Sequence, residues 1–122
     1  MKKVLVFGNP LIEEDNMAVK LALELKLPSV EFVLCDSFSQ LLDYNEEELV
    51  ILDVVENLKK TTLIEDLDKL NLTKSLTTHD FDLGFNLKLM KALGRIKEFK
   101  IIGIPQKGDK EEIKKGIEKL LV

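Results

Sequence analysis

Val4-Leu5-Val6-Phe7 is an uninterrupted apolar run near the start of the chain, and Gly8-Asn9-Pro10 closes it. A short, fully apolar run with such an ending is typical of a central parallel strand that is buried on both faces. Leu49-Val50-Ile51-Leu52 repeats the pattern, and Asp53 follows it directly. The two runs predict the centre of a parallel sheet with polar residues at the carboxyl ends of its strands.

Helical and strand-like patterns alternate around these two runs. Apolar residues from Met17 to Leu27 follow helical spacing until Pro28, which predicts a helix that ends there. Further strands are predicted at 30–34, 61–64 and 99–104, a short helix or turn at 38–42, and further helices at 83–95 and 109–121. The alternation predicts an α/β fold with three layers, in which a doubly wound, mostly parallel sheet carries helices on both faces. The segment 61–64 has polar flanks and is predicted to be an edge strand, and the sheet is expected to contain one antiparallel edge strand.

Size and composition indicate one globular domain over residues 1–122, with 45% hydrophobic and 33% charged residues. The net charge of −4 argues against nucleic acid as a partner, and no apolar stretch is long enough for membrane insertion. Cys35 is the only cysteine, and no export signal is visible, so a cytoplasmic location is expected. A chain of this size is expected to be a monomer.

Three residues stand out as candidates for a functional site. Asp15 ends the acidic run Glu13-Glu14-Asp15 after the first strand, Asp53 ends the apolar run of the central strand, and His79 is the only histidine. Each has a structural alternative. Acids before a helix stabilise its dipole, an aspartate after a strand often forms a turn, and a lone histidine often packs in a core. His79 lies in a polar segment, which makes the core alternative weaker.

Two carboxylates and one imidazole are a suitable ligand set for a borderline divalent metal ion, and three protein ligands leave coordination positions for water or substrate. The sequence has no His-Glu-x-x-His spacing, so the set would assemble from separate loops. In parallel sheets, loops at the carboxyl ends of the strands converge and bind ligands. Cys35 lacks a spare histidine as its base and is interpreted as a buried structural thiol.

These residues resemble those of the hydrogenase maturation endopeptidases. The resemblance is carried by Gly8-Asn9-Pro10-Leu11 with the acidic pair Glu14-Asp15, by Asp53 after a hydrophobic strand, and by Thr78-His79-Asp80. The late segment Ile101-Ile102-Gly103-Ile104-Pro105-Gln106 is also similar to that family. The shared order of motifs extends through most of the chain.

The resemblance implies a specific activity. Such proteases remove a carboxyl-terminal extension from the large-subunit precursor of nickel–iron hydrogenases after nickel insertion, and the nickel in the precursor serves as the recognition element. Asp15, Asp53 and His79 would then be the metal ligands and catalytic residues, with Glu14 and Asn9 supporting them or contacting the substrate. No organic cofactor is implied.

Two alternatives remain open at this point. The first is a protein on the same scaffold that binds a hydrogenase subunit or a metal without cutting a peptide bond. The second is a metal-dependent hydrolase that holds its own ion and acts on another substrate. Metal content and a cleavage assay distinguish these alternatives from the endopeptidase.

Overall fold

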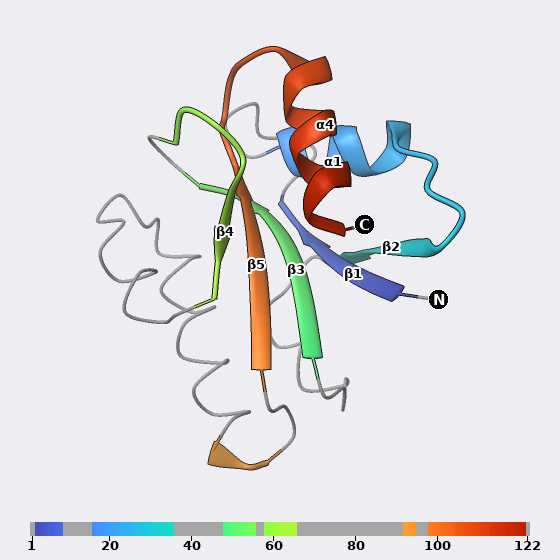
Figure 1. Ribbon diagram of the computed structural model, residues 1–122, viewed down its shortest axis with the longest axis vertical. Helices are drawn as coiled ribbons and strands as arrows, with labels where there is room; N and C mark the ends of the chain where they lie inside the picture. The colour runs from blue at the N-terminus through green and yellow to red at the C-terminus, as the bar shows by residue number, and fades with distance from the viewer. Residues whose placement is uncertain are drawn as a thin grey trace.

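The computed structural model describes residues 2–8, 16–35, 48–55, 58–65, 92–94 and 98–121 (Figure 1). The strands within these ranges are β1 (Lys2–Phe7), β2 (Val30–Cys35), β3 (Glu48–Val54), β4 (Thr62–Ile64) and β5 (Glu98–Ile104). The helices within them are α1 (Met17–Glu24) and α4 (Lys110–Leu121).

The strands form one sheet in the order β2-β1-β3-β5-β4. Strands β1, β2, β3 and β5 are parallel, and β4 pairs antiparallel to β5 at one edge. The predicted mostly parallel sheet and its antiparallel edge strand are therefore confirmed. The chain passes from β1 to β2 on one side and then to β3 on the other, so the winding direction reverses between β1 and β3.

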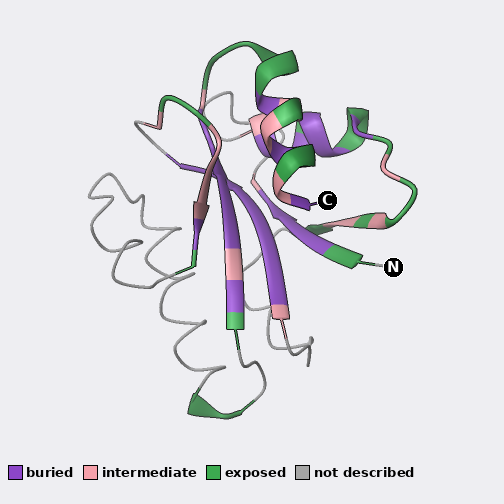
Figure 2. Cartoon of the chain, viewed as in Figure 1, coloured by how far each residue is buried: buried purple, intermediate pink, exposed green. Residues whose placement is uncertain are grey.

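Helices α1 and α4 pack on the same face of the sheet. Alternate residues of a strand point to opposite faces, and Val50, Leu52 and Val54 of β3 belong to a buried cluster that also contains residues of both helices. Each helix contributes an apolar stripe to this cluster, which for α4 consists of Ile113, Ile117 and Leu121. Figure 2 shows that β3 and β5 are buried along most of their length.

The opposite face of the sheet is buried as well. Leu5, Ile51 and Ile101 point to that face and are at most 1% exposed. The helix predicted at 83–95 falls outside the described residues except for 92–94, where Gly94 has a φ of 72°, a conformation in which helices commonly end. The predicted layer of helices on this second face stays a prediction.

Helix α1 is shorter than its sequence pattern predicts. It ends at Glu24, because Leu25 already has an extended backbone, and Leu27 accepts a hydrogen bond from the Val30 N–H in the turn before β2. Leu25 nevertheless buries its side chain in the same cluster, and Leu27 packs against it. The apolar spacing therefore continues past the end of the helix, because Leu25 and Leu27 face the core although neither is helical.

A surface ion-pair network connects the two helices. Glu24 of α1 accepts hydrogen bonds from Lys114 at 2.9 Å and from Lys110 at 3.4 Å, both on α4. The hydrogen bond from Lys114 is the main cause that lowers the pKa of Glu24, and the same bond raises the pKa of Lys114. Such exposed pairs orient the helices but contribute little to stability.

Helix α4 approaches the segment before β4 so closely that only glycine fits at position 116. A Cβ built on Gly116 would lie 2.8 Å from both Cβ and Oγ1 of Thr61. Neither atom is the far end of a flexible chain, so either the helix or the segment would have to move. This contact sets the distance between α4 and the start of β4.

We therefore expect Gly116→Ala to destabilise the protein by roughly 1–2 kcal/mol, because the overpacking cost exceeds the gain in helix propensity of about 1 kcal/mol. Urea unfolding followed by circular dichroism measures the change. Glu118→Ala, at an exposed position of the same helix, is the control and should change stability by no more than about 0.5 kcal/mol. A Gly116→Ala protein as stable as the parent would show that the contact is not tight.

Candidate functional site

Asp53 is the one charged side chain that is buried among the described residues, with 3% of its surface exposed. It is the penultimate residue of β3, at the carboxyl edge of the sheet. Transfer of a carboxylate from water into an apolar interior is costly unless hydrogen bonds or a cation compensate for the lost hydration. A charged residue among the otherwise apolar buried residues of β3 points to a function beyond folding.

The local backbone fixes the orientation of this carboxylate. Oδ1 of Asp53 accepts a hydrogen bond from the backbone N–H of Val54, with an N–O distance of 2.9 Å. Because Val54 packs with the helices, Asp53 points to the opposite face of the sheet, away from α1 and α4. The site is therefore on the face that the two described helices leave uncovered.

Apolar side chains cover Gly103, the residue of β5 beside Asp53. Asp53 pairs with Gly103, whose missing side chain makes room for the chain that follows β3. A Cβ on Gly103 would lie 3.0 Å from a methyl group of Leu58 and 3.1 Å from one of Val55. The backbone N–H of Val55 donates to Ile104 and holds this segment against β5. The sequence showed Gly103 as part of a motif, but only the register places it beside the carboxylate.

The other side of Asp53 faces the end of β1. Val6 of β1 pairs with Leu52 of β3, and continuation of this register by one residue places Phe7 beside Asp53. Gly8 follows with a φ of 145°, a backbone conformation that residues with a Cβ rarely adopt. The chain leaves the sheet at this residue, directly after β1 ends at Phe7. Asp53 thus borders the point where the winding reverses, which is where ligands bind in open α/β sheets.

The structure describes the position of one of the predicted ligands and tests the ligand role of none of them. Asp53 lies at the carboxyl edge as predicted, while Asp15, His79, Glu14 and Asn9 lie outside the described residues. Asp15 belongs to the connection between β1 and α1, which starts next to Asp53 in the sheet. Within the described ranges, no three His, Cys, Asp or Glu side chains form a group that could hold a metal ion. The assembly of Asp15, Asp53 and His79 around one ion stays a prediction.

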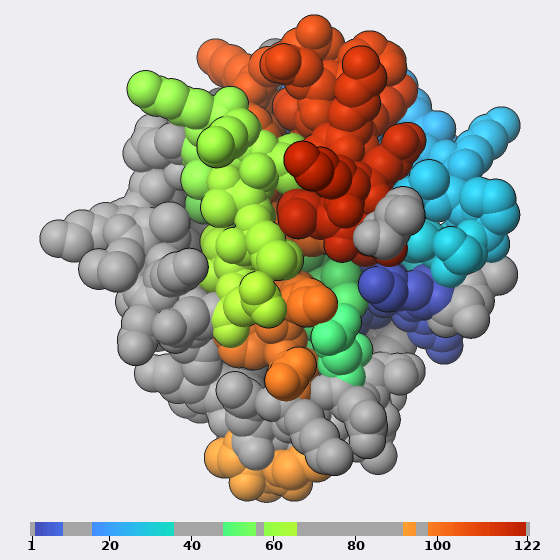
Figure 3. Space-filling model, viewed as in Figure 1, coloured from blue at the N-terminus to red at the C-terminus, as the bar shows by residue number. Residues whose placement is uncertain are grey.

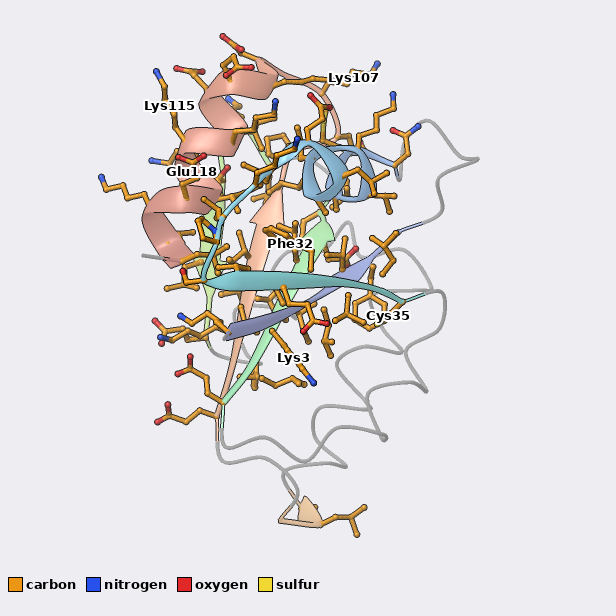
Figure 4. The ribbon with its side chains drawn as sticks, turned by 90° about the vertical axis from the view of Figure 1, so that its right-hand side faces the viewer. Lys3, Phe32, Cys35, Lys107, Lys115 and Glu118 are labelled. Carbon is orange, nitrogen blue, oxygen red and sulfur yellow. The ribbon has the colours of Figure 1, made fainter. Side chains whose placement is uncertain are left out.

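Cys35 occupies the same row of the sheet as Asp53, but one strand separates them. Cys35 pairs with Phe7, which in turn lies beside Asp53, so the two residues are two strand spacings, roughly 10 Å, apart. Cys35 is the last residue of β2 (Figure 4). Its thiol is buried, and Sγ lies 3.6 Å from the carbonyl oxygen of Val33. Its position agrees with a structural thiol.

If the chain has the peptidase activity that its sequence resemblance implies, Cys35→Ser is expected to keep the rate of that cleavage within about twofold, since the thiol packs and does not react. The serine hydroxyl can donate to the same carbonyl, so the loss of stability should be about 1 kcal/mol. Cleavage and thermal unfolding are measured on the same preparation. Loss of all cleavage in a folded Cys35→Ser protein would contradict the prediction and favour a thiol mechanism.

No family model and no curated protein matches the chain. Solved structures do match it along almost its whole length. The hydrogenase maturating endopeptidase HybD from E. coli has a TM-score of 0.71 at 19% identity, covering 99% of this chain and 90% of that chain. The hydrogenase 3 maturation protease has a TM-score of 0.65 at 21% identity, with 98% and 86% covered. The nickel–iron hydrogenase maturation protease HycI from Thermococcus kodakarensis KOD1 has a TM-score of 0.58 at 20% identity, again with 98% and 86% covered.

These likenesses show that the chain has the fold of these proteins. They cover the whole arrangement of the sheet and its helices rather than a shared fragment. No helix among the described residues is long and apolar enough to cross a membrane.

Proposed function

We propose that this chain, which has the fold of the hydrogenase maturation endopeptidases, is itself such an enzyme. It would remove the carboxyl-terminal extension of a nickel–iron hydrogenase large-subunit precursor after nickel insertion. The observation that carries the proposal is the buried Asp53 at the carboxyl edge of the sheet, beside the reversal of the winding. The fold likeness and the order of the motifs with Asp15, Asp53 and His79 support it.

The donor set fits the nickel ion that the precursor brings. Asp53 is a buried carboxylate, and a cation compensates for the cost of burying its charge. With Asp15 and His79 it would offer two carboxylates and an imidazole, which suit a borderline divalent ion. A metal ion held there supplies a Lewis acid for the scissile carbonyl or for a water molecule.

Asp53 would position the precursor rather than form a bond with it. Its carboxylate is held by the Val54 N–H, so it can engage a cation without first losing rotamer freedom. The burial of Asp53, which is 3% exposed, lowers the local dielectric and would strengthen the attraction between carboxylate and metal. No residue of the described site has the surroundings of a covalent nucleophile, and the proposed reaction is direct hydrolysis.

The test is a cleavage assay with the large-subunit precursor encoded in the same genome. The precursor is prepared with and without nickel, incubated with the purified protein and analysed by intact mass spectrometry. We expect loss of the extension from the nickel-loaded form alone. Binding without cleavage would instead support a non-proteolytic partner of the hydrogenase subunit. A stoichiometric metal ion in the purified protein would support a hydrolase that holds its own ion.

A further inference from the structure

Gly103 interrupts a row of side chains that runs across the carboxyl edge of the sheet. The register places Asp53 of β3 on one side of Gly103 and Thr62 of β4 on the other. Glycine within a strand costs stability, and it often marks a place where another part of the chain comes close. The backbone does not require glycine here, because Gly103 lacks the positive φ found at Gly8 and Gly108. The reason for a glycine at this position is therefore space.

Three apolar side chains occupy the space above Gly103. Besides the methyl groups of Leu58 at 3.0 Å and Val55 at 3.1 Å, one of Ile64 lies 3.6 Å from the position of a Cβ. The three come from different parts of the chain, since Val55 follows β3 directly, Leu58 precedes β4 and Ile64 ends β4. A Cβ at Gly103 would point to the same face as Asp53, one strand spacing of about 5 Å away. This packing therefore lies next to the residue that carries the buried carboxylate.

Val55 and Leu58 differ in how far they can yield to an added side chain. Leu58 is half-buried, and Figure 3 shows that the segment 58–64 lies at the surface, so the end of its side chain can turn outward. Val55 is 2% exposed, and its branched side chain has few rotamers. Its backbone N–H also donates a hydrogen bond of 2.9 Å to the carbonyl oxygen of Ile104. A methyl group at position 103 would therefore displace Val55 together with its backbone.

The position of Val55 matters for Asp53 because consecutive backbone groups connect the two residues. The N–H of Val54, one residue before Val55, donates the hydrogen bond of 2.9 Å to Oδ1 of Asp53. Peptide bonds are planar, so only two torsions per residue can absorb a shift of Val55 before it reaches this N–H. The orientation of the carboxylate thus depends on the packing above Gly103.

We propose that Gly103 is a positioning residue for Asp53. Its missing side chain lets Val55 and Leu58 pack directly on β5, and this packing holds the carboxylate in the orientation that the reaction uses. The inference rests on the proposed function for the reaction, but the positioning itself is measurable without a substrate. An added methyl group requires a shift of a few tenths of an ångström, which approaches the limit of about 0.5 Å within which functional groups must be held.

The test uses variants that disturb this packing in different ways. Gly103→Ala adds the clashing methyl group, and Gly103→Ala/Val55→Ala removes the less yielding of its two close contacts again. Leu58→Ala removes part of the packing without a clash, so it tests the inference even if Gly103→Ala fails to fold. Ile117→Val is the control, because it destabilises the core on the opposite face, where Ile117 is fully buried.

Amide hydrogen exchange, measured by NMR, reports on the hydrogen bond between the Val54 N–H and Asp53. The protection of Val54 is divided by that of Leu52, a buried residue of the same strand. This ratio cancels changes in global stability, because global unfolding exposes both amides equally. Steady-state cleavage of the nickel-loaded precursor gives kcat/KM for the same proteins.

We expect Gly103→Ala to lower the Val54 protection ratio about tenfold and Leu58→Ala to lower it about threefold. The value of kcat/KM should fall by about the same factors, since misplacement of a functional group by a fraction of an ångström costs rate. Both quantities should return to within about twofold of the parent in Gly103→Ala/Val55→Ala, and Ile117→Val should leave both unchanged.

The results separate this inference from the proposed function. Parent-like protection ratios in Gly103→Ala and Leu58→Ala would overturn the inference, as would equal losses in Ile117→Val or a double variant that recovers neither quantity. Cleavage at the parent rate in a Gly103→Ala protein with a lowered ratio would overturn it as well and leave the endopeptidase proposal intact. A ratio that falls in Gly103→Ala and recovers in the double variant, in a protein that cuts no precursor, would support the positioning of Asp53 and contradict the endopeptidase proposal.

Discussion

Asp53→Asn is expected to lower the rate of precursor cleavage by at least about 100-fold while the protein stays folded. Asparagine has nearly the same shape, and its carbonyl oxygen can still accept the hydrogen bond from the Val54 N–H. The substitution removes the negative charge with which a cation is held. Because the lost charge was buried, thermal unfolding should occur at the same or a higher temperature than in the parent protein.

Glu48→Gln is the matched control for Asp53→Asn. Glu48 begins the same strand at its opposite end, where its carboxylate forms a half-exposed ion pair with Lys100. Its replacement should leave the cleavage rate within about twofold and stability within roughly 0.5 kcal/mol. If Asp53→Asn cleaves the nickel-loaded precursor as fast as Glu48→Gln does, the buried carboxylate has no part in the reaction.

His79→Ala is expected to abolish precursor cleavage with little change in stability. The reason comes from the sequence, where His79 lies in the polar stretch Thr77-Thr78-His79-Asp80 and resembles a ligand of the maturation endopeptidases. An exposed ligand contributes to the site and not to packing, so the free energy of unfolding should change by no more than ~0.5 kcal/mol. A structural histidine in a core would cost clearly more.

The assay for His79→Ala measures cleavage and unfolding on the same preparation, with Thr77→Ala as the control in the same segment. Full activity of His79→Ala toward the nickel-loaded precursor would exclude its role as a ligand. Lost cleavage together with strong destabilisation would favour the core alternative. The ligand assignment needs lost cleavage in a protein as stable as Thr77→Ala.

The centre of the fold was predictable because buried parallel strands have a strong local signature. The apolar runs at 4–7 and 49–52 lie in β1 and β3, and the polar flanks of 61–64 identified β4 as an edge strand. The end of α1 was not predictable from apolar spacing, because Leu25 and Leu27 face the core without being helical. The spacing of apolar residues shows which side chains are buried, but it does not show whether the backbone at those residues is helical or extended.

The candidate site was predictable only in part, for a related reason. Asp53 could be placed at a strand end because the signal is local. Its pairing with Gly103 depends on the register of β3 and β5, and the close approach of α4 to Thr61 depends on how the helix packs. Contacts between segments that are distant in the chain leave no periodic pattern in either segment.

The pairing of β3 with β5 also has a consequence for how the chain folds. Strands β1 and β2 and the helix between them lie within residues 2–35, whereas β3 at 48–54 pairs along its full length with β5 at 98–104. Closing the larger loop costs more chain entropy, and non-local strand pairing is the slow class of contact in folding. The N-terminal half of the sheet is therefore expected to form early and the β3–β5 seam late. Asp53 becomes buried only when β3 pairs with β5. We therefore expect the slow step of folding, the pairing of these two strands, to create the buried environment of the carboxylate as well.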